Sequence, residues 1–286
     1  MILKSYRSAA EFLAETQAAL EAHEAANNLM YGLALRLQRY PERIQVPPYF
    51  GVVRRGSELR AAALMTPPHN LVVYAAPDGG DADGAFALIA RDLRERSWPI
   101  PGVLGPNEPA LAFARAWQAL TGEACQLKTH ERVYELRQVV PPPAPPGQMR
   151  PAELEDLELV ARWICEFHQE AVPEEAITLE EARENSRVKI GDQDLYLWEH
   201  RQPVALVGRT RPTPNGICIG PVYTPQDFRR QGYATSLTAA FSQLQLDGGK
   251  KYTALFTNLA NPISNSIYQK IGYRPVCDFD LYGFIK

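Results

Sequence analysis

The sequence predicts an α/β protein with two similar domains in tandem, each a mixed, mostly antiparallel sheet flanked by helices. Strand-like and helix-like segments alternate along the chain, as they do in sheets covered by helices. A helix that ends in glycine before a strand occurs twice, at Gly122 and at Gly272. Between the halves lies VVPPPAPPGQMRP, residues 139–151, whose consecutive prolines favour a stiff, extended spacer.

We therefore predict a first domain over residues 1–138, a linker over 139–148 and a second domain over 149–286. In the first half, hydrophobic periodicity and turn residues predict, in order, a long helix before residue 49, strands in 49–66 and 70–76, a helix in 84–96, a strand in 101–106, a helix in 109–122 and a strand in 130–136.

The second half repeats this outline. Thr178 and Glu181 form the sequence pattern of a capping box at the start of a helix. The pattern predicts, in order, helices in 152–170 and 178–190, strands in 194–200, 203–211 and 215–225, a helix in 234–250, a strand in 251–258, a helix in 261–273 and a final strand in 274–284.

Composition narrows the function classes. Apolar residues make up 45% of the chain and charged residues 22%, which is a foldable globular composition. The net charge of −3 provides no general attraction for nucleic acid. The N-terminal segment contains repeated Glu and no continuous apolar core, so neither a signal peptide nor a membrane span is expected, and the protein is predicted to be cytoplasmic. No metal site or redox pair is predicted, and we expect reduced, mostly buried thiols at the four separated cysteines, Cys125, Cys165, Cys218 and Cys277.

The segment FRRQGYATSL, residues 228–237, combines features of an anion site. The strand before it must end at Pro225, which cannot donate to a ladder, and the helix after it begins with N–H groups that lack intrahelical partners. Gly232 has no Cβ and Ala234 only a methyl group, so a ligand can approach the backbone closely. Free amides, the positive end of a helix dipole and two arginines favour a phosphate or pyrophosphate. The alternative interpretation is a surface turn with solvated arginines.

Two stretches, residues 222–240 and 255–273, resemble the acetyl-CoA-binding core of the GNAT superfamily of acyl-CoA-dependent N-acyltransferases. The family's pyrophosphate loop is Q/R-x-x-G-x-G/A, which Arg229, Gly232 and Ala234 match. The family's last helix is matched at six positions, Asn261, Ser264, Asn265, Tyr268, Gly272 and Tyr273. The resemblance covers roughly residues 149–286, and the first half resembles the same fold only in outline.

The resemblance implies which residues bind acetyl-CoA. Backbone groups of Val222, Tyr223 and Thr224 would bind its pantetheine arm. The pyrophosphate would lie on the loop with Arg229, on the amides of Arg230, Gln231, Gly232, Tyr233, Ala234 and Thr235, and Asn261 and Asn265 would contact the cofactor near the last helix. Gly220 and Pro221 inside the preceding strand indicate a local irregularity such as a bulge.

Tyr268 matches the family's usual general acid, which protonates the departing thiolate; the alternative is a core aromatic. Relatives that acetylate protein N-termini have a Glu base on the strand before the last helix, and the corresponding position here is Phe256. An α-amino group could be deprotonated through a water relay alone, because its pKa is near 8. Other carboxylates and imidazoles remain open as a base, a cation site or solvated positions, namely Glu166, His168, Glu170, Glu199 and His200.

The first half is predicted to do no chemistry. Its counterpart of the anion loop, residues 77–84, contains Asp78, Asp81 and Asp83, which would repel a pyrophosphate. Gln118 takes the position of the acid. The roles left open are shaping the acceptor cleft, providing the surface of a homodimer or stabilising the active half; Trp98 and Trp117 are expected in the core.

The resemblance predicts an N-acetyltransferase that moves an acetyl group from acetyl-CoA to a primary amine, either a small molecule or a peptide N-terminus. The alternative is a non-catalytic acyl-CoA-binding sensor or regulator. A third class, nucleic-acid modification, is disfavoured by the net acidity and by the lack of an arginine-aromatic tract.

Overall fold

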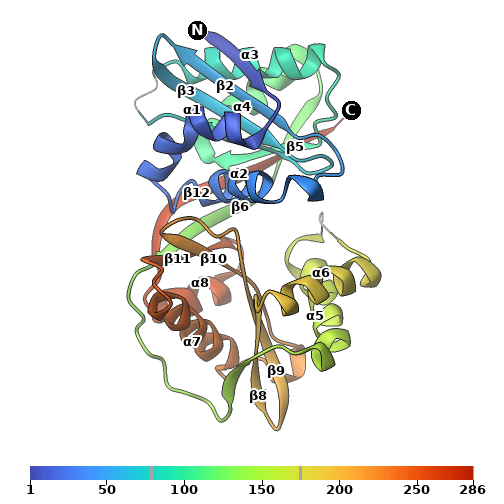
Figure 1. Ribbon diagram of the computed structural model, residues 1–286, viewed down its shortest axis with the longest axis vertical. Helices are drawn as coiled ribbons and strands as arrows, with labels where there is room; N and C mark the ends of the chain where they lie inside the picture. Colours follow the sequence, from blue (N-terminus) through green and yellow to red (C-terminus); the bar gives the residue numbers. More distant parts are fainter. Residues whose placement is uncertain (78–79, 174–175, 286) are drawn as a thin grey trace. The chain divides into compact units, whose positions relative to one another are not determined.

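The computed structural model describes residues 1–77, 80–173 and 176–285 (Figure 1). One order of elements occurs twice along the chain. The first series is β1 (Ile2–Tyr6), α1 (Ala9–Ala22), α2 (Asn28–Arg39), β2 (Tyr49–Arg55), β3 (Glu58–Met65), β4 (Leu71–Ala75), α3 (Ala82–Glu95), β5 (Gly102–Pro106), α4 (Asn107–Thr121) and β6 (Ala124–Leu136). The second is β7 (Gln148–Pro151), α5 (Leu157–Ala171), α6 (Leu179–Gly191), β8 (Leu195–His200), β9 (Gln202–Thr210), β10 (Gly216–Tyr223), α7 (Tyr233–Asp247), β11 (Tyr252–Asn258), α8 (Pro262–Lys270) and β12 (Arg274–Ile285).

The strand pairing repeats as well. In the first series β1, β2, β3 and β4 pair antiparallel in that order, and β4 pairs parallel with β5. In the second series β7, β8, β9 and β10 pair antiparallel, and β10 pairs parallel with β11. Each series of strands is therefore mixed and mostly antiparallel, and the predicted α/β class with two tandem domains of one fold is confirmed.

The chain divides into two compact units. Unit 1 comprises Met1–Val133, Phe256–Asn261 and Pro275–Lys286, and unit 2 comprises Tyr134–Leu255 and Pro262–Arg274. The last strand in sequence, β12, pairs antiparallel with β5 of the first series, Phe279 opposite Pro106 and Gly283 opposite Gly102. The division into domains at the proline-rich segment stays a prediction.

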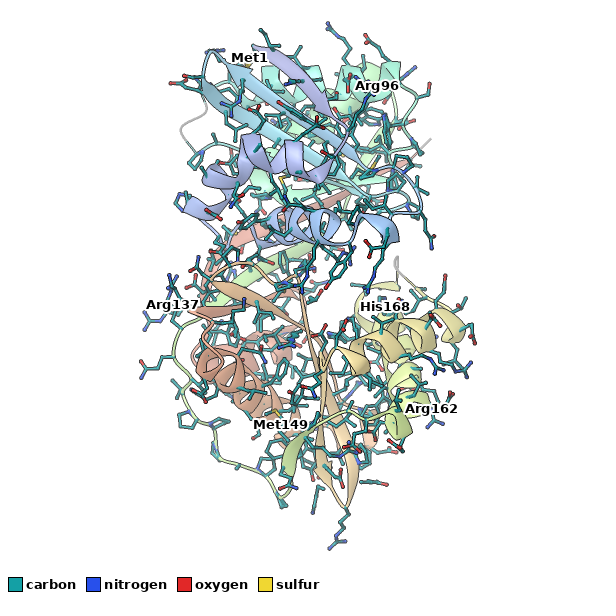
Figure 2. The ribbon with its side chains drawn as sticks, in the orientation of Figure 1. Met1, Arg96, Arg137, Met149, Arg162 and His168 are labelled. Atoms are coloured by element: carbon teal, nitrogen blue, oxygen red, sulfur yellow. The ribbon has the colours of Figure 1, made fainter. Side chains whose placement is uncertain are left out.

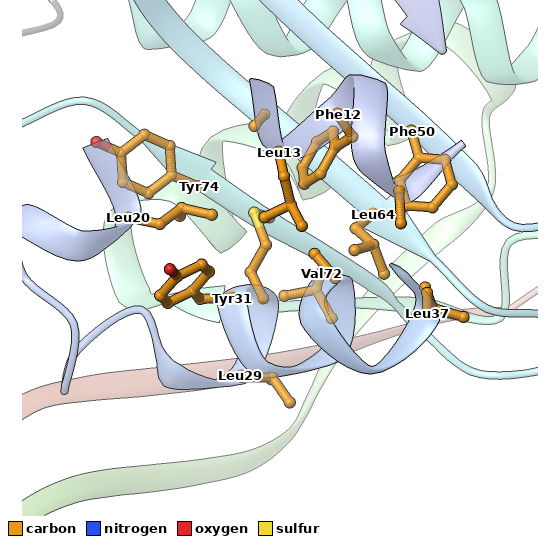
Figure 3. Close-up of a cluster of buried hydrophobic side chains, with 14 of the residues drawn as sticks. Phe12, Leu13, Leu20, Leu29, Tyr31, Leu37, Phe50, Leu64, Val72 and Tyr74 are labelled. Carbon is orange, nitrogen blue, oxygen red and sulfur yellow. The ribbon is translucent and has the colours of Figure 1, made fainter. Parts of the chain in front are cut away.

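Unit 1 has a hydrophobic core on each face of its sheet. On one face α1 and α2 pack on alternate residues of β2 to β4, among them Phe50, Leu64 and Val72 (Figure 3). On the other face α3 and α4 pack on the intervening residues, such as Val53 and Val73. This alternation follows from the two-residue period of strand side chains. Trp117 is buried in the second core and Trp98 packs against it, as predicted.

Unit 2 follows the same rule. On one face α7 and α8 pack in a core with Trp198, Val207 and Ile219, and on the other face α5 and α6 pack on Leu197, Leu206 and other strand residues (Figure 1). The predicted capping box of α6 is confirmed, since the Glu181 amide donates to Thr178 Oγ1 and the Thr178 amide donates to Glu181 Oε2.

Three expectations were wrong in detail. The long N-terminal helix is two helices, α1 and α2, separated after the C-cap His23. The end of the proline-rich run is not spacer, because β7 pairs with β8. The rest of the run packs along unit 2, where the Val140 amide donates to the Ile271 carbonyl and the Trp198 indole donates to the Pro146 carbonyl. The proline content of this run predicts an extended spacer, whereas its contacts with residues distant in sequence hold it against unit 2.

The four cysteines are free thiols, but only Cys218 is buried and the other three are half-buried. Within the described ranges, none of the helices combines the length and the apolar character that crossing a lipid bilayer would require.

Candidate active site

Strand β10 is irregular at the residues predicted to bind pantetheine. Its register with β9 shifts between Ile219 and Val222, so the expected bulge is present at the intervening glycine and proline. Val222 and Tyr223 then pair with Val207 and Leu206 of β9. Among the described residues, the parallel pairing of β10 with β11 runs from Gly216 to Cys218.

The loop after β10 has an unusual backbone. A short 3₁₀ turn, Gln226–Phe228, follows Pro225, and Arg229 is extended with φ −69° and ψ 158°. Arg230 then adopts a positive φ of 65° and Gly232 one of 85°. A Cβ added to Gly232 would meet no atom within 4 Å, so this glycine is required by its φ and not by crowding from the protein. Left-handed residues within a turn can direct neighbouring backbone N–H groups toward one side, as in an anion-binding nest.

Six consecutive amides of this loop have no acceptor among the described residues. Gly232 provides no side-chain cap to α7, and the first intrahelical bond is from the Ser236 amide to the Gly232 carbonyl at 3.0 Å. In the part of the chain that the structure describes, the amides of residues 230–235 have no protein acceptor. Since the N-terminus of a helix carries a partial positive charge, this arrangement is suited to an anion.

The side chain of Arg229 is committed within unit 2. Its Nε donates to the Thr224 carbonyl at 2.8 Å, and its Nη2 donates to Glu170 Oε2 at 2.6 Å. Of the two arginines expected to add positive charge to the loop, Arg229 is thus neutralised by a carboxylate. Sequence reasoning missed this pairing, because Glu170, in the last turn of α5, lies 59 positions before Arg229.

Glu166 and Glu170, expected as a base, a cation site or a solvated helix end, both contact Tyr223. The Tyr223 hydroxyl donates to Glu166 Oε2 at 2.8 Å and lies 3.4 Å from Glu170 Oε1. Burial, followed by the hydrogen bond to Glu166, raises the pKa of Tyr223 above its ordinary value, so this phenol stays neutral. The carboxylates therefore fasten the end of α5 to β10.

Tyr268 lies on α8 in the core of unit 2, only 8% exposed, with its ring 5.9 Å from that of Tyr273. The Tyr273 hydroxyl bonds to Ser242 and Thr253, whereas the Tyr268 hydroxyl has no partner in the described ranges. Burial raises the pKa of Tyr268 to about 12. The ring of Tyr268 therefore packs in the core, while its hydroxyl makes no hydrogen bond within the described residues.

The two asparagines predicted to contact the cofactor belong to different units. Asn261 is the last residue of the middle segment of unit 1 and directly precedes α8 in sequence. Asn265, in α8, accepts a hydrogen bond from the Tyr134 hydroxyl at 3.0 Å through its side-chain oxygen. Part of its hydrogen-bonding capacity is therefore used within unit 2.

Two of the other candidate bases, His200 and Glu199, bond to other side chains of the protein, and the third is His168. His200 Nδ1 lies 2.8 Å from the hydroxyl of Tyr233, the first residue of α7. Glu199 is ion-paired with Arg150. His168, labelled on α5 in Figure 2, has a buried Nδ1 with no hydrogen-bond partner in the described part of the chain.

The counterpart loop in unit 1 is closed by its own side chain. Asp81 is the N-cap of α3 and accepts a hydrogen bond from the Gly84 amide at 2.9 Å. Asp78 lies outside the described residues. Gln118, at the position of the acid, is exposed on α4, and Phe256 packs in the core of unit 1 with its ring 5.3 Å from Phe279. The carboxylate of Asp81 thus lies at the N-terminus of α3 and accepts from one of its amides, and Phe256 offers no strand carboxylate.

Comparison with known proteins places the fold. A family model described as FR47-like protein matches residues 199–279. A search of curated proteins finds no match to the sequence. An acetyltransferase of the GNAT family from Colwellia psychrerythraea is 13% identical with a TM-score of 0.61, each chain being 99% covered. A GCN5-related N-acetyltransferase from Sphaerobacter thermophilus is 16% identical with a TM-score of 0.63, covering 99% of this chain and 96% of that one.

A third solved structure is described as a tandem GNAT protein from the clavulanic acid biosynthesis pathway. It is 14% identical with a TM-score of 0.59, covering 98% of this chain and 97% of that one. The present chain therefore has the fold of a tandem GNAT protein over its described length. The FR47-like match falls in the second repeat and includes the loop with the free amides.

Proposed function

We propose that the protein is an acyl-CoA-dependent N-acetyltransferase whose chemistry resides in the second repeat. The observation that carries the proposal is the row of six free amides, residues 230–235, at the start of α7. Their number and the positive φ values of Arg230 and Gly232 fit the diphosphate of coenzyme A, which offers several acceptor oxygens on one group. The motif that matches the GNAT loop covers the same residues.

In this proposal β10 binds the pantetheine arm through backbone groups of Val222, Tyr223 and Thr224, beyond the bulge. The amide of Val222 is the candidate donor to the carbonyl oxygen as the amine attacks and negative charge develops there. The resemblance also predicts cofactor contacts from Asn261 and Asn265, whereas the side chain of Arg229 is engaged with Thr224 and Glu170. Acetyl-CoA supplies the activated acyl group, and no metal is required by this mechanism.

Tyr268 is the proposed proton donor to the sulfur as the bond between carbon and sulfur breaks. With a pKa of about 12 the phenol is fully protonated at neutral pH. Complete transfer to a thiolate whose conjugate acid has a pKa near 8.5 would be uphill by about 5 kcal/mol. That cost is well below the barrier of roughly 16 kcal/mol that corresponds to about 10 turnovers per second. The role is energetically compatible with ordinary enzyme rates.

The acceptor must reach the site as a neutral amine. Phe256 replaces the strand carboxylate of some relatives and packs in an apolar core, so it offers no base. An α-amino group, with a pKa near 8, is about a tenth neutral at pH 7, whereas an alkyl ammonium with a pKa near 10 is only about a thousandth neutral. We therefore favour acceptors with an α-amino group, either an amino-acid-like small molecule or a peptide N-terminus.

The second candidate function is an acyl-CoA-binding sensor, which the missing strand carboxylate favours. The deciding experiment measures acetyl-CoA binding by calorimetry and thiol release with a panel of small amines and peptides. Binding with thiol release supports the transferase. Binding without release across the panel supports the sensor, and lack of binding contradicts both.

A further inference from the structure

The guanidinium of Arg229 is surrounded by groups of the protein. Its Nε bonds to the Thr224 carbonyl, its Nη2 bonds to Glu170, and its Cζ lies 5.8 Å from the centroid of the Tyr223 ring. Two of its donor positions are thereby used, one to the end of β10 and one to the last turn of α5. The guanidinium keeps three further N–H donors, but Thr224 and Glu170 set its position and its charge is already paired with a carboxylate.

Glu170 is held from its other side as well. The Tyr223 hydroxyl is 3.4 Å from Glu170 Oε1 and donates to Glu166 at 2.8 Å. Arg229 and Tyr223 thus contact different oxygens of one carboxylate, which fixes its position. The side chains of Arg229 and Glu170 are 38% and 44% exposed, so this ion pair is partly screened by solvent.

The loop needs an anchor of this kind. From Thr224 to Gly232 its only regular structure is the single 3₁₀ turn, Gln226–Phe228. Directly after Arg229, Arg230 has a φ of 65°, a left-handed conformation that is unfavourable for a residue with a Cβ. Contacts outside the backbone must therefore stabilise the loop, and those of Arg229 are adjacent to the strained residue.

We propose that Arg229 and Glu170 are positioning residues that hold the free amides in their anion-binding conformation, and that Arg229 is not itself a phosphate ligand. This inference rests on the proposed function, because it assigns roles around the same cofactor loop. It also makes cofactor affinity depend on α5, through a carboxylate that does not touch the cofactor.

The alternative, direct phosphate binding by Arg229, predicts the opposite sign at Glu170. If the guanidinium had to leave Glu170 to bind the diphosphate, the carboxylate would compete with the ligand. Removing that carboxylate would then free a positive charge and strengthen binding. If Glu170 positions the loop, its removal weakens binding, so the sign of the effect separates the two models.

The experiment compares Arg229→Met, Glu170→Met and the double variant, each as the full chain, by calorimetry with acetyl-CoA. Glu158→Met is the matched control, because Glu158 lies at the other end of α5 and pairs with Arg183 at 2.8 Å. We expect the affinity for acetyl-CoA to fall about tenfold for Arg229→Met and about fivefold for Glu170→Met. The double variant should be no worse than about tenfold, because both changes remove the same ion pair. In turnover assays the KM for acetyl-CoA should rise while kcat holds.

A second measurement is independent of the cofactor. The amides of Phe228 and Arg229 bond to the carbonyls of Pro225 and Gln226, and their hydrogen exchange in the free protein reports the loop conformation. Exchange should accelerate in Arg229→Met and Glu170→Met and stay unchanged in Glu158→Met. Unaltered exchange in both loop variants, or acetyl-CoA affinity that is unchanged or higher in Glu170→Met, would overturn the inference. Failure of the wild-type protein to bind acetyl-CoA would instead contradict the proposed function, and the exchange result would still decide the positioning role.

Discussion

The two repeats differ at the start of the helix that follows their fourth strand. In unit 1 the helix α3 begins with Asp81, whose carboxylate accepts a hydrogen bond from the Gly84 amide. In unit 2 the helix α7 begins at Gly232 with no side-chain cap, and the amides around it are free within the described chain. One repeat places its own carboxylate at the helix terminus, where it accepts from one amide, and the other has a glycine there and no side-chain cap.

This difference teaches that element order and strand pairing do not determine whether a repeat of this fold can bind an anion. Both repeats have the antiparallel strands, the parallel pair and the two helices that flank it. What separates them is the residue at one helix terminus: a carboxylate that opposes anions, or a glycine whose φ turns the backbone outward.

Gly232→Glu should abolish acetyl-CoA binding. Its side chain would enter open space beside the free amides and bring a negative charge to the proposed diphosphate position. We expect the affinity measured by calorimetry to fall by about 100-fold or more, equivalent to roughly 2.7 kcal/mol.

Gly249→Glu is the matched control. Gly249 has a φ of 93°, is likewise open around its Cβ, and lies just after the other end of α7. The Gly249→Glu substitution therefore introduces the same backbone strain and the same charge at a position outside the loop. Equal losses in both variants, or an unchanged affinity in Gly232→Glu, would remove the basis for placing the diphosphate on this loop.

Tyr268→Phe should lower kcat by about 100-fold while leaving acetyl-CoA affinity within about twofold, because a general acid acts only on the reacting bond. Steady-state kinetics and calorimetry measure the two effects separately. Tyr273→Phe is the control, since its hydroxyl bonds to Ser242 and Thr253 and should affect stability instead of turnover. A fall in kcat in Tyr273→Phe as large as in Tyr268→Phe would indicate general damage to the core.

The pH profile of kcat sharpens this assignment. An acid must be protonated to act, and burial raises the pKa of Tyr268 to about 12, so it stays protonated throughout the neutral and mildly alkaline range. Because this pKa exceeds the unfolded value near 10, the group's contribution to stability is complete below about pH 10 and is lost as the pH rises toward 12. We therefore expect no alkaline decline in kcat up to about pH 10. A decline centred near pH 8 or 9 that disappears in Tyr268→Phe would mean a much lower pKa at this residue.

Most of the fold could be predicted from the sequence because its signals are local. The Thr178 capping box, the glycines that end α4 and α8 and the bulge after Ile219 all arise within a few residues. The break between α1 and α2 was missed, since it contains neither glycine nor proline. The strand β7 and the pairing of β12 with β5 were missed because both depend on contacts distant in sequence.

The candidate site divides in the same way. The free amides and the glycine at the start of α7 could be predicted, because a turn and a helix terminus follow from neighbouring residues. The partner of Arg229 could not, since Glu170 is 59 positions away and its sequence context suits a solvated helix end equally well. Side-chain networks become visible only when the elements are placed in space.

Gly272→Ala should destabilise the protein more than Gly122→Ala, although both glycines end equivalent helices with positive φ. A Cβ at Gly272 would lie 2.7 Å from the Gln138 carbonyl oxygen, whereas a Cβ at Gly122 would meet nothing within 4 Å. We expect a loss of about 1 kcal/mol in the free energy of unfolding for Gly122→Ala and about 2–3 kcal/mol for Gly272→Ala. Urea unfolding followed by circular dichroism measures both, and equal losses would show that the Gln138 backbone yields easily.

Asp81→Ala tests whether the cap alone separates the two repeats. Removing the carboxylate should cost about 1 kcal/mol of unfolding free energy, because the Gly84 amide loses its acceptor. Asp81→Asn keeps an acceptor and should stay near wild type in urea unfolding. Calorimetry with acetyl-CoA should still give one site per chain in Asp81→Ala, since α3 has no left-handed glycine as its N-cap, unlike α7. A second site would mean that the backbone at the start of α3 can still bind an anion. The Asp81 carboxylate alone would then account for the functional difference between the repeats.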